Sequence, residues 1–205
     1  MKITGIKQQV KRSDRYSIFI DGRYGFSLSD TALLDNKLVP GQELSAKEVR
    51  EFKQLSQDDK LYNLTLRYVA LRPRSRWEIE TYLERKKAAP ALTSKILNKL
   101  SDIDLIDDKK FAVAFASDRR QLRLASRRKI IQELRQKRVA DDVIQIAVGN
   151  KAEDEHAALH EVIDRKRRQS RYHDDLKLMQ YLARQGFNYG DIKDALKDSG
   201  PNANG

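Results

Sequence analysis

The sequence predicts a mainly α-helical protein, in which a small N-terminal β domain precedes tandem three-helix repeats that form an elongated, curved solenoid. Three observations lead to this prediction. Alternation of apolar and polar residues ends before residue 45, helical spacing of apolar residues then continues to residue 199, and similar helical segments recur roughly every 50 residues. A three-helix unit buries its own apolar face poorly, so neighbouring units are expected to stack.

Residues 1–44 have the pattern of a three-stranded β domain. Residues 3–10 read as one strand, and YSIFIDGRYGFSL reads as two strands joined at an Asp-Gly dipeptide, which suits a type I′ hairpin turn. The alternation places four large side chains on one sheet face: Phe19, Tyr24, Phe26 and Leu28. We expect this face either to pack on the first repeat or to form a separate contact surface.

The helical region divides into a connecting helix over 45–57 and repeats at 58–106, 107–150 and 151–200, followed by a disordered tail at 201–205. Ser45 opens the connecting helix, because Glu48 stands three residues later as in a capping box. Each repeat has an amphipathic second helix with an aligned leucine near its end: Leu83, Leu134 and Leu182.

Acidic residues recur in the segments QDDK, IDDKK and EDE, each expected at the start of the first helix of a repeat. Paired carboxylates can hold Mg²⁺, but this position favours capping of free helical N–H groups. His156 and His160 could share a zinc ion on one helix face, although the glutamate of a metalloprotease motif is missing. No glycine-rich phosphate loop or catalytic triad is recognisable, so we expect no enzyme, no metal and no cofactor.

The chain is strongly basic, with a formal net charge of +11 and a pI near 9.7. This balance favours a polyanionic partner, such as nucleic acid or an acidic protein groove. The sequence contains no cysteine and no apolar run as long as a membrane span, so we expect a soluble cytoplasmic protein that does not bind membranes.

Basic residues cluster at the corner between the first and second helices of every repeat. Their last-turn members could simply favour the negative end of a helix dipole, but Arg74, Arg76, Arg127 and Arg128 start helices and oppose it. We therefore expect the corners to form one basic stripe along the solenoid. The candidate contact residues are Arg72, Arg74, Arg76, Arg119, Arg120, Arg123, Arg127, Arg128, Lys129, Arg165, Arg167, Arg168 and Arg171.

Four segments together resemble the RecX family of recombination regulators: LRPRSRWEIETYLERK, DLIDDKKFAVAFASDRR, IIQELRQKRVADDVIQIAV and LMQYLARQGFNYGDIKDAL. The resemblance runs from about residue 58 to residue 199, and RYSIFIDGRYGFSLSDTALL looks like the N-terminal extension of some members. One departure stands out. The family usually has glycine as a left-handed cap after the second helix, whereas this chain has Lys87, Arg138 and only then Gly186.

The resemblance implies a modulator of the RecA recombinase that lies in the groove of the RecA–single-stranded-DNA filament. We expect the chain to be a monomer. It implies inhibition of ATP hydrolysis, strand exchange and co-protease activity, and thereby of recombination and the SOS response. It leaves open whether the chain blocks filament growth, promotes disassembly or assists the recombinase. Two alternatives stay open: a protein that binds single- or double-stranded DNA directly, and a Mg²⁺-dependent nuclease built on the aspartate pairs.

Overall fold

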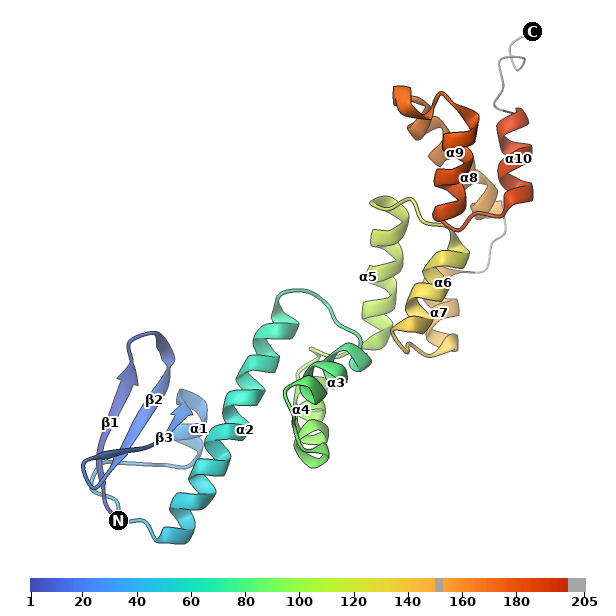
Figure 1. Cartoon of the computed structure of the whole chain (residues 1–205). Coiled ribbons are helices and arrows are strands. Elements are labelled where there is room, and N and C mark those ends of the chain that lie inside the picture. The colour runs from blue at the N-terminus through green and yellow to red at the C-terminus, as the bar shows by residue number, and fades with distance from the viewer. Residues whose placement is uncertain (150–152, 199–205) are drawn as a thin grey trace. The chain divides into compact units, whose positions relative to one another are not determined.

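The structure, a computed structural model, describes residues 1–149 and 153–198 (Figure 1). The chain forms two compact units, one made of Met1–Arg72 with Ile79–Leu105, the other of Pro73–Glu78 with the residues from Ile106 on. The described residues contain three strands and ten α-helices, so the predicted class of a mainly α protein with an N-terminal three-stranded sheet is confirmed. The curvature of the predicted solenoid stays a prediction, and the tail at 201–205 lies outside the described residues.

The first unit holds the sheet and four helices. They are β1 (Ile3–Gln9), β2 (Arg12–Ile20), β3 (Arg23–Ser29), α1 (Asp30–Asp35), α2 (Ala46–Ala70), α3 (Arg76–Arg85), whose first turn belongs to the second unit, and α4 (Pro90–Asp102). The second unit holds two three-helix modules. They are α5 (Asp108–Gln121), α6 (Arg127–Gln136) and α7 (Asp141–Val148), then α8 (Glu153–Arg167), a 3-10 turn at Ser170–Tyr172, α9 (Asp175–Arg184) and α10 (Tyr189–Asp198).

The sheet is an antiparallel meander in the order β1-β2-β3. Its β2–β3 turn has positive φ at both central residues, 47° at Asp21 and 79° at Gly22, as a type I′ turn requires. Phe19 and Tyr24 pair across the strands with their rings edge to face, and the ring centroids lie 6.3 Å apart. The predicted hairpin and this pair are therefore confirmed.

The predicted sheet face is wrong, because β3 contains a bulge. Ile18 pairs with Phe26 while Phe19 pairs with Tyr24, so Gly25 is the extra residue and shifts the alternation by one. As a result Phe26 and Leu28 are buried in the core of the sheet, whereas the Tyr24 side chain points away and is 60% exposed. A Cβ atom on Gly25 would lie 2.8 Å from the Ile20 Cδ1 atom, so a larger residue in the bulge would require the Ile20 side chain to shift.

Helix α2 is one continuous helix, so the connecting helix and the first helix of the first repeat are not separate elements. Its Ser45–Glu48 capping box is confirmed, with hydrogen bonds of 2.7 and 3.2 Å. The capping role expected for the first acidic pair is wrong, because Asp58 and Asp59 lie in the middle of α2, where backbone N–H groups already bond within the helix. Phe26 of the sheet stacks on Phe52 of α2 with ring centroids 5.4 Å apart.

The carboxylate of Asp59 instead joins α2 to the sheet. It accepts hydrogen bonds from the Arg15 guanidinium at 2.8 Å and from the Ser29 hydroxyl at 2.6 Å. The side chains of Arg15 and Asp59 are only 6% and 7% exposed, so this ion pair is buried. Burial of two charges is tolerated when hydrogen bonds satisfy both of them, as they do here.

The second helices α3, α6 and α9 end in the same way, which confirms the predicted repeat at atomic detail. In each, the residue after the left-handed position donates to the carbonyl of the aligned leucine: Ala88 to Leu83 at 3.1 Å, Val139 to Leu134 at 3.2 Å, and Phe187 to Leu182 at 3.3 Å. The left-handed residues have φ of 60° at Lys87, 55° at Arg138 and 91° at Gly186. The left-handed turn is thus retained without glycine, at a cost of about 1 kcal/mol for each non-glycine residue.

Each module of the second unit has its own apolar core, and the two cores are linked by the chain between α5 and α6. Ala125 belongs to the core of α5–α7, while the preceding Leu124 is buried in the core of α8–α10 with Leu159 and Phe187. The expectation that a module relies on its neighbour to bury apolar surface therefore applies to this pair.

Candidate filament and nucleic-acid interface

Residues 73–78, which contain most of the first basic corner, belong to the second unit. Ser75 and Glu78 form the predicted capping box of α3, with hydrogen bonds of 3.1 and 3.2 Å. The Ser75 hydroxyl also donates to the Lys137 carbonyl at 3.1 Å, at the end of α6. In addition, the backbone N–H of Arg76 donates to the Asp108 carboxylate at 2.8 Å. Within the second unit, Ser75 and Arg76 are therefore bonded to the module α5–α7.

The second basic corner repeats this arrangement one module later. The backbone N–H of Ser126 donates to the Gln185 carbonyl at 2.9 Å, at the end of α9. The backbone N–H of Arg127 donates to the Glu155 carboxylate at 3.0 Å, as that of Arg76 does to Asp108. Asp108 and Glu155, near the starts of α5 and α8, thus each accept a hydrogen bond from the first residue of a second helix, α3 and α6 respectively.

Asp107 caps its own helix, as predicted for this acidic pair. Its carboxylate accepts hydrogen bonds from the backbone N–H groups of Lys109 at 2.8 Å and Lys110 at 3.0 Å. The pKa of Asp107 lies below its ordinary value, mainly because its carboxylate accepts the hydrogen bond from the Lys110 N–H. The hydrogen bond from Lys109 and the positive charges of both lysines lower the pKa further. Partial burial of the carboxylate opposes this shift. Across residues 1–149 and 153–198, no three His, Asp or Glu side chains lie together as metal ligands would.

Several predicted contact residues are occupied by interactions inside the protein. Arg119 pairs with Glu133 and lies over the Phe115 ring at 4.3 Å. Arg127 donates to the Gly149 carbonyl and to the Gln145 side chain, each at 2.9 Å. The other internally bonded members are Arg120, which donates to the Val148 carbonyl, Lys129, which donates to the Arg184 carbonyl at 2.7 Å, and Arg167, which pairs with Asp175.

Other predicted contact residues point to solvent. Arg123, Arg128 and Arg168 are exposed, and none of them has a hydrogen-bond or ion-pair partner in the described part of the chain. Arg165 reaches the Gln121 carbonyl only at 3.4 Å, and Arg171 lies over the Tyr172 ring at 5.8 Å. In the first corner Arg72 and Arg76 are exposed and Arg74 is half-buried. In the second and third corners, the structure therefore separates basic residues that bond within the protein, such as Arg119 and Arg127, from Arg123, Arg128 and Arg168, whose charge faces outward.

The hydrogen bonds to Asp108 and Glu155 and the buried Arg15 were not predicted from the sequence. The recurrence of acidic residues in the segments IDDKK and EDE was the available signal for the first two. Arg15 lies within β2 and gives no local pattern, because its partner Asp59 is 44 residues away.

Comparison with known proteins gives three matches to family models. The model described as the Regulatory protein RecX N-terminal domain matches residues 1–45, that of the RecX second three-helix domain matches 107–148, and that of the third matches 153–196. The chain belongs to the RecX family. Among curated RecX-family relatives, the Regulatory protein RecX of Lactobacillus johnsonii is 35% identical over 70% of this chain and 52% of its own length. That of Bacillus subtilis is 30% identical over 72% of this chain and 56% of its own length.

The chain spans about half the length of these curated relatives. Among solved structures, a crystal structure of regulatory protein RecX aligns with a TM-score of 0.69 and 28% identity, over 94% of this chain and 98% of that one. The RecX structure from Lactobacillus salivarius aligns with a TM-score of 0.55 over 69% of this chain and 95% of that one; at 24% identity it supports the fold. For the described residues, no helix is both long and apolar enough to span a bilayer.

Proposed function

We propose that this RecX-family chain regulates recombination by binding in the groove of the RecA–single-stranded-DNA filament. There it inhibits the ATP hydrolysis, strand exchange and co-protease activity of the filament. The chain acts as a monomer in the cytoplasm, without catalysing a reaction of its own. Membership of a regulatory family is the observation that carries this proposal. The solvent-facing arginines of the basic corners would bind the acidic groups of the filament.

Arginine suits both surfaces that such a groove offers. Its planar guanidinium forms paired hydrogen bonds with phosphates of the DNA and with carboxylates of a protein. Arg123, Arg128 and Arg168 are available for these bonds because internal partners do not occupy them among the described residues. Binding of this kind reads charge and shape rather than base sequence.

The test is a titration of recombinase ATPase activity on single-stranded DNA with the purified chain at low salt. We expect the ATPase rate to fall as the chain approaches stoichiometry with the recombinase. An unchanged rate, with strand exchange and co-protease activity also unchanged, would refute the proposal.

The net charge of +11 supports a second candidate, direct binding to DNA without a recombinase. This function predicts tight binding to naked single- or double-stranded DNA, with an affinity that falls steeply as salt rises. Filament regulation instead predicts preference for the coated strand. Anisotropy measurements on the same labelled oligonucleotide, with and without recombinase, distinguish the two.

A further inference from the structure

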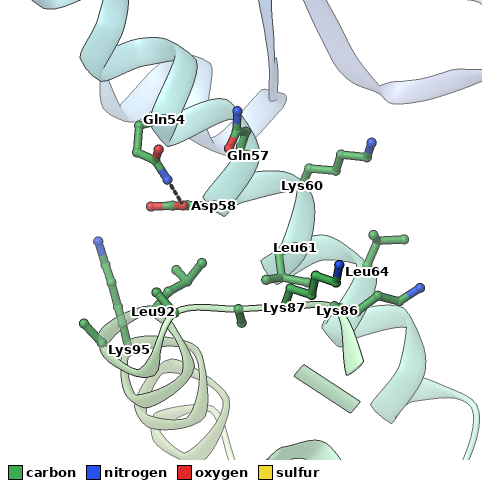
Figure 2. A pocket seen from close by; sticks show the side chains of 13 residues that line it. Gln54, Gln57, Asp58, Lys60, Leu61, Leu64, Lys86, Lys87, Leu92 and Lys95 are labelled. Atoms are coloured by element: carbon green, nitrogen blue, oxygen red, sulfur yellow. Dashed lines mark hydrogen bonds between the residues drawn. The ribbon is translucent and has the colours of Figure 1, made fainter. Parts of the chain in front are cut away.

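A second basic surface lies in the first unit, between α2 and the turn that joins α3 to α4. We call it the lysine groove. It has a volume of about 690 Å³. Its apolar floor consists of the half-buried side chains of Leu61, Leu64 and Leu92. Four exposed lysines stand around this floor: Lys60, Lys86, Lys87 and Lys95. Figure 2 shows Lys87 beside Leu61 and Leu64, with Lys95 and Leu92 on the α4 side.

The lysine groove carries a strong excess of positive charge. Among the described residues that line it, Asp58 supplies the single carboxylate against four lysines, which leaves a formal charge of +3. The Asp58 carboxylate accepts a 2.8 Å hydrogen bond from the Gln54 amide (Figure 2). The groove therefore combines an aliphatic floor with a rim that attracts anions.

The backbone of Lys87 is strained, which suggests that its side chain makes a contact that offsets the cost. Lys87 has φ of 60°, a conformation that favours glycine, and the equivalent position after α9 is Gly186. The other non-glycine residue at this position, Arg138, places its guanidinium 5.9 Å from the centroid of the Trp77 ring, so an internal contact offsets its cost. The Lys87 side chain has no hydrogen-bond, ion-pair or ring partner in the described part of the chain. Its contact is therefore expected outside the protein.

We propose that the lysine groove binds an acidic segment of a partner protein, which places an aliphatic side chain on the leucine floor and carboxylates beside Lys87 and Lys95. Charge complementarity selects the acidic segment, and the leucines select an apolar anchor. Single-stranded nucleic acid fits less well, because such grooves stack bases on aromatic rings and none of the described lining residues is aromatic.

The test measures fluorescence anisotropy of the full chain with a short labelled peptide of alternating glutamate and leucine. A peptide with glutamine in place of glutamate and a labelled oligothymidine serve as comparison probes. We expect the glutamate peptide to bind and Lys87→Gly to weaken that binding about twofold to fivefold, the range for one exposed ion pair. The same variant should not lower the midpoint of thermal unfolding, since glycine relieves the left-handed backbone.

Arg138→Gly is the matched control, because it makes the same change at the equivalent turn outside the groove. It should leave the affinity for the glutamate peptide unchanged. Equal binding of the glutamate peptide by the wild type and Lys87→Gly would overturn the proposal, as would equal binding of the glutamine peptide. Loss of oligothymidine binding alone in Lys87→Gly would identify a nucleic-acid groove instead. No recombinase is present in this experiment, so its outcome is independent of the proposed filament function.

Discussion

Ser126 and Gly186 lie so close together that the second unit has no space for a side chain at residue 186. A Cβ atom on Gly186 would lie 2.6 Å from the Ser126 Oγ atom and 2.8 Å from the Lys129 Cβ atom. The adjacent backbones are joined by the 2.9 Å hydrogen bond from Ser126 to Gln185. Glycine is thus required twice over, by its φ of 91° and by the close approach of the two modules.

Gly186→Ala should lower the free energy of unfolding by about 2–4 kcal/mol, because it adds a steric clash to the cost of positive φ. Urea unfolding followed by circular dichroism measures the loss. Gly41→Ala is the matched control, since Gly41 also has φ of 91° but no atom lies within 4 Å of its added Cβ. That variant should cost only about 1 kcal/mol. Equal losses would show that contact with Ser126 contributes nothing.

The buried ion pair between Arg15 and Asp59 gives a second prediction. Arg15→Met should destabilise the first unit by about 3–5 kcal/mol, because it leaves the Asp59 carboxylate buried without its cation. Arg67→Met removes an exposed ion pair of similar length, 2.7 Å to Asp14, and should cost less than about 1 kcal/mol. Thermal and urea unfolding of the two variants test the difference. A loss from Arg15→Met no larger than that from Arg67→Met would contradict the structural role of the buried pair.

Two neighbouring arginines separate structural from binding roles. Arg128→Glu should not lower the unfolding midpoint, because it replaces a positive charge by a negative one in the first turn of α6. It should weaken binding to the recombinase filament roughly fivefold to tenfold, since it replaces an outward-facing attraction with a repulsion. Arg127→Glu should instead cost about 1–3 kcal/mol of stability, because it loses the bonds to Gly149 and Gln145 and adds a carboxylate near Glu155. Circular dichroism and filament-binding anisotropy measure the two effects. A folded Arg128→Glu chain that binds like the wild type would remove Arg128 from the interface.

Features encoded within a few consecutive residues could be predicted from the sequence. Examples are the capping boxes at Ser45 and Ser75 and the hairpin turn at Asp21. The repeat of second helices could also be predicted, because similar segments recur along the sequence. The bulge at Gly25 could not be predicted, because the apolar alternation of β3 continues unbroken while the pairing shifts. One unpaired residue therefore moved Tyr24 to the opposite face.

The candidate site could be predicted only as a set of basic corners. Which arginines face outward depends on partners far along the chain, as the Lys129 bond to the Arg184 carbonyl, 55 residues away, illustrates. The capping role predicted for Asp59 was wrong for the same reason. Its partner Ser29 lies 30 residues away along the chain, and the helix start expected beside Asp59 does not exist, because α2 continues through it. Local patterns locate charge, whereas tertiary packing decides how each charge is used.

The cap at Asp107 predicts a dependence of stability on pH. Asp107→Asn keeps a capping oxygen but loses the negative charge at the helix N-terminus, and should cost about 0.3–1 kcal/mol at neutral pH. Because the hydrogen bond from Lys110 lowers the pKa of Asp107 in the folded chain, this advantage of the wild type is fully present above the ordinary pKa of 3.8. It should disappear as the pH falls through the still lower folded pKa, where the carboxylate becomes protonated. Urea midpoints of wild type and Asp107→Asn should therefore converge on acidification, and a gap that stays constant or widens would show that the charge of Asp107 does not stabilise α5.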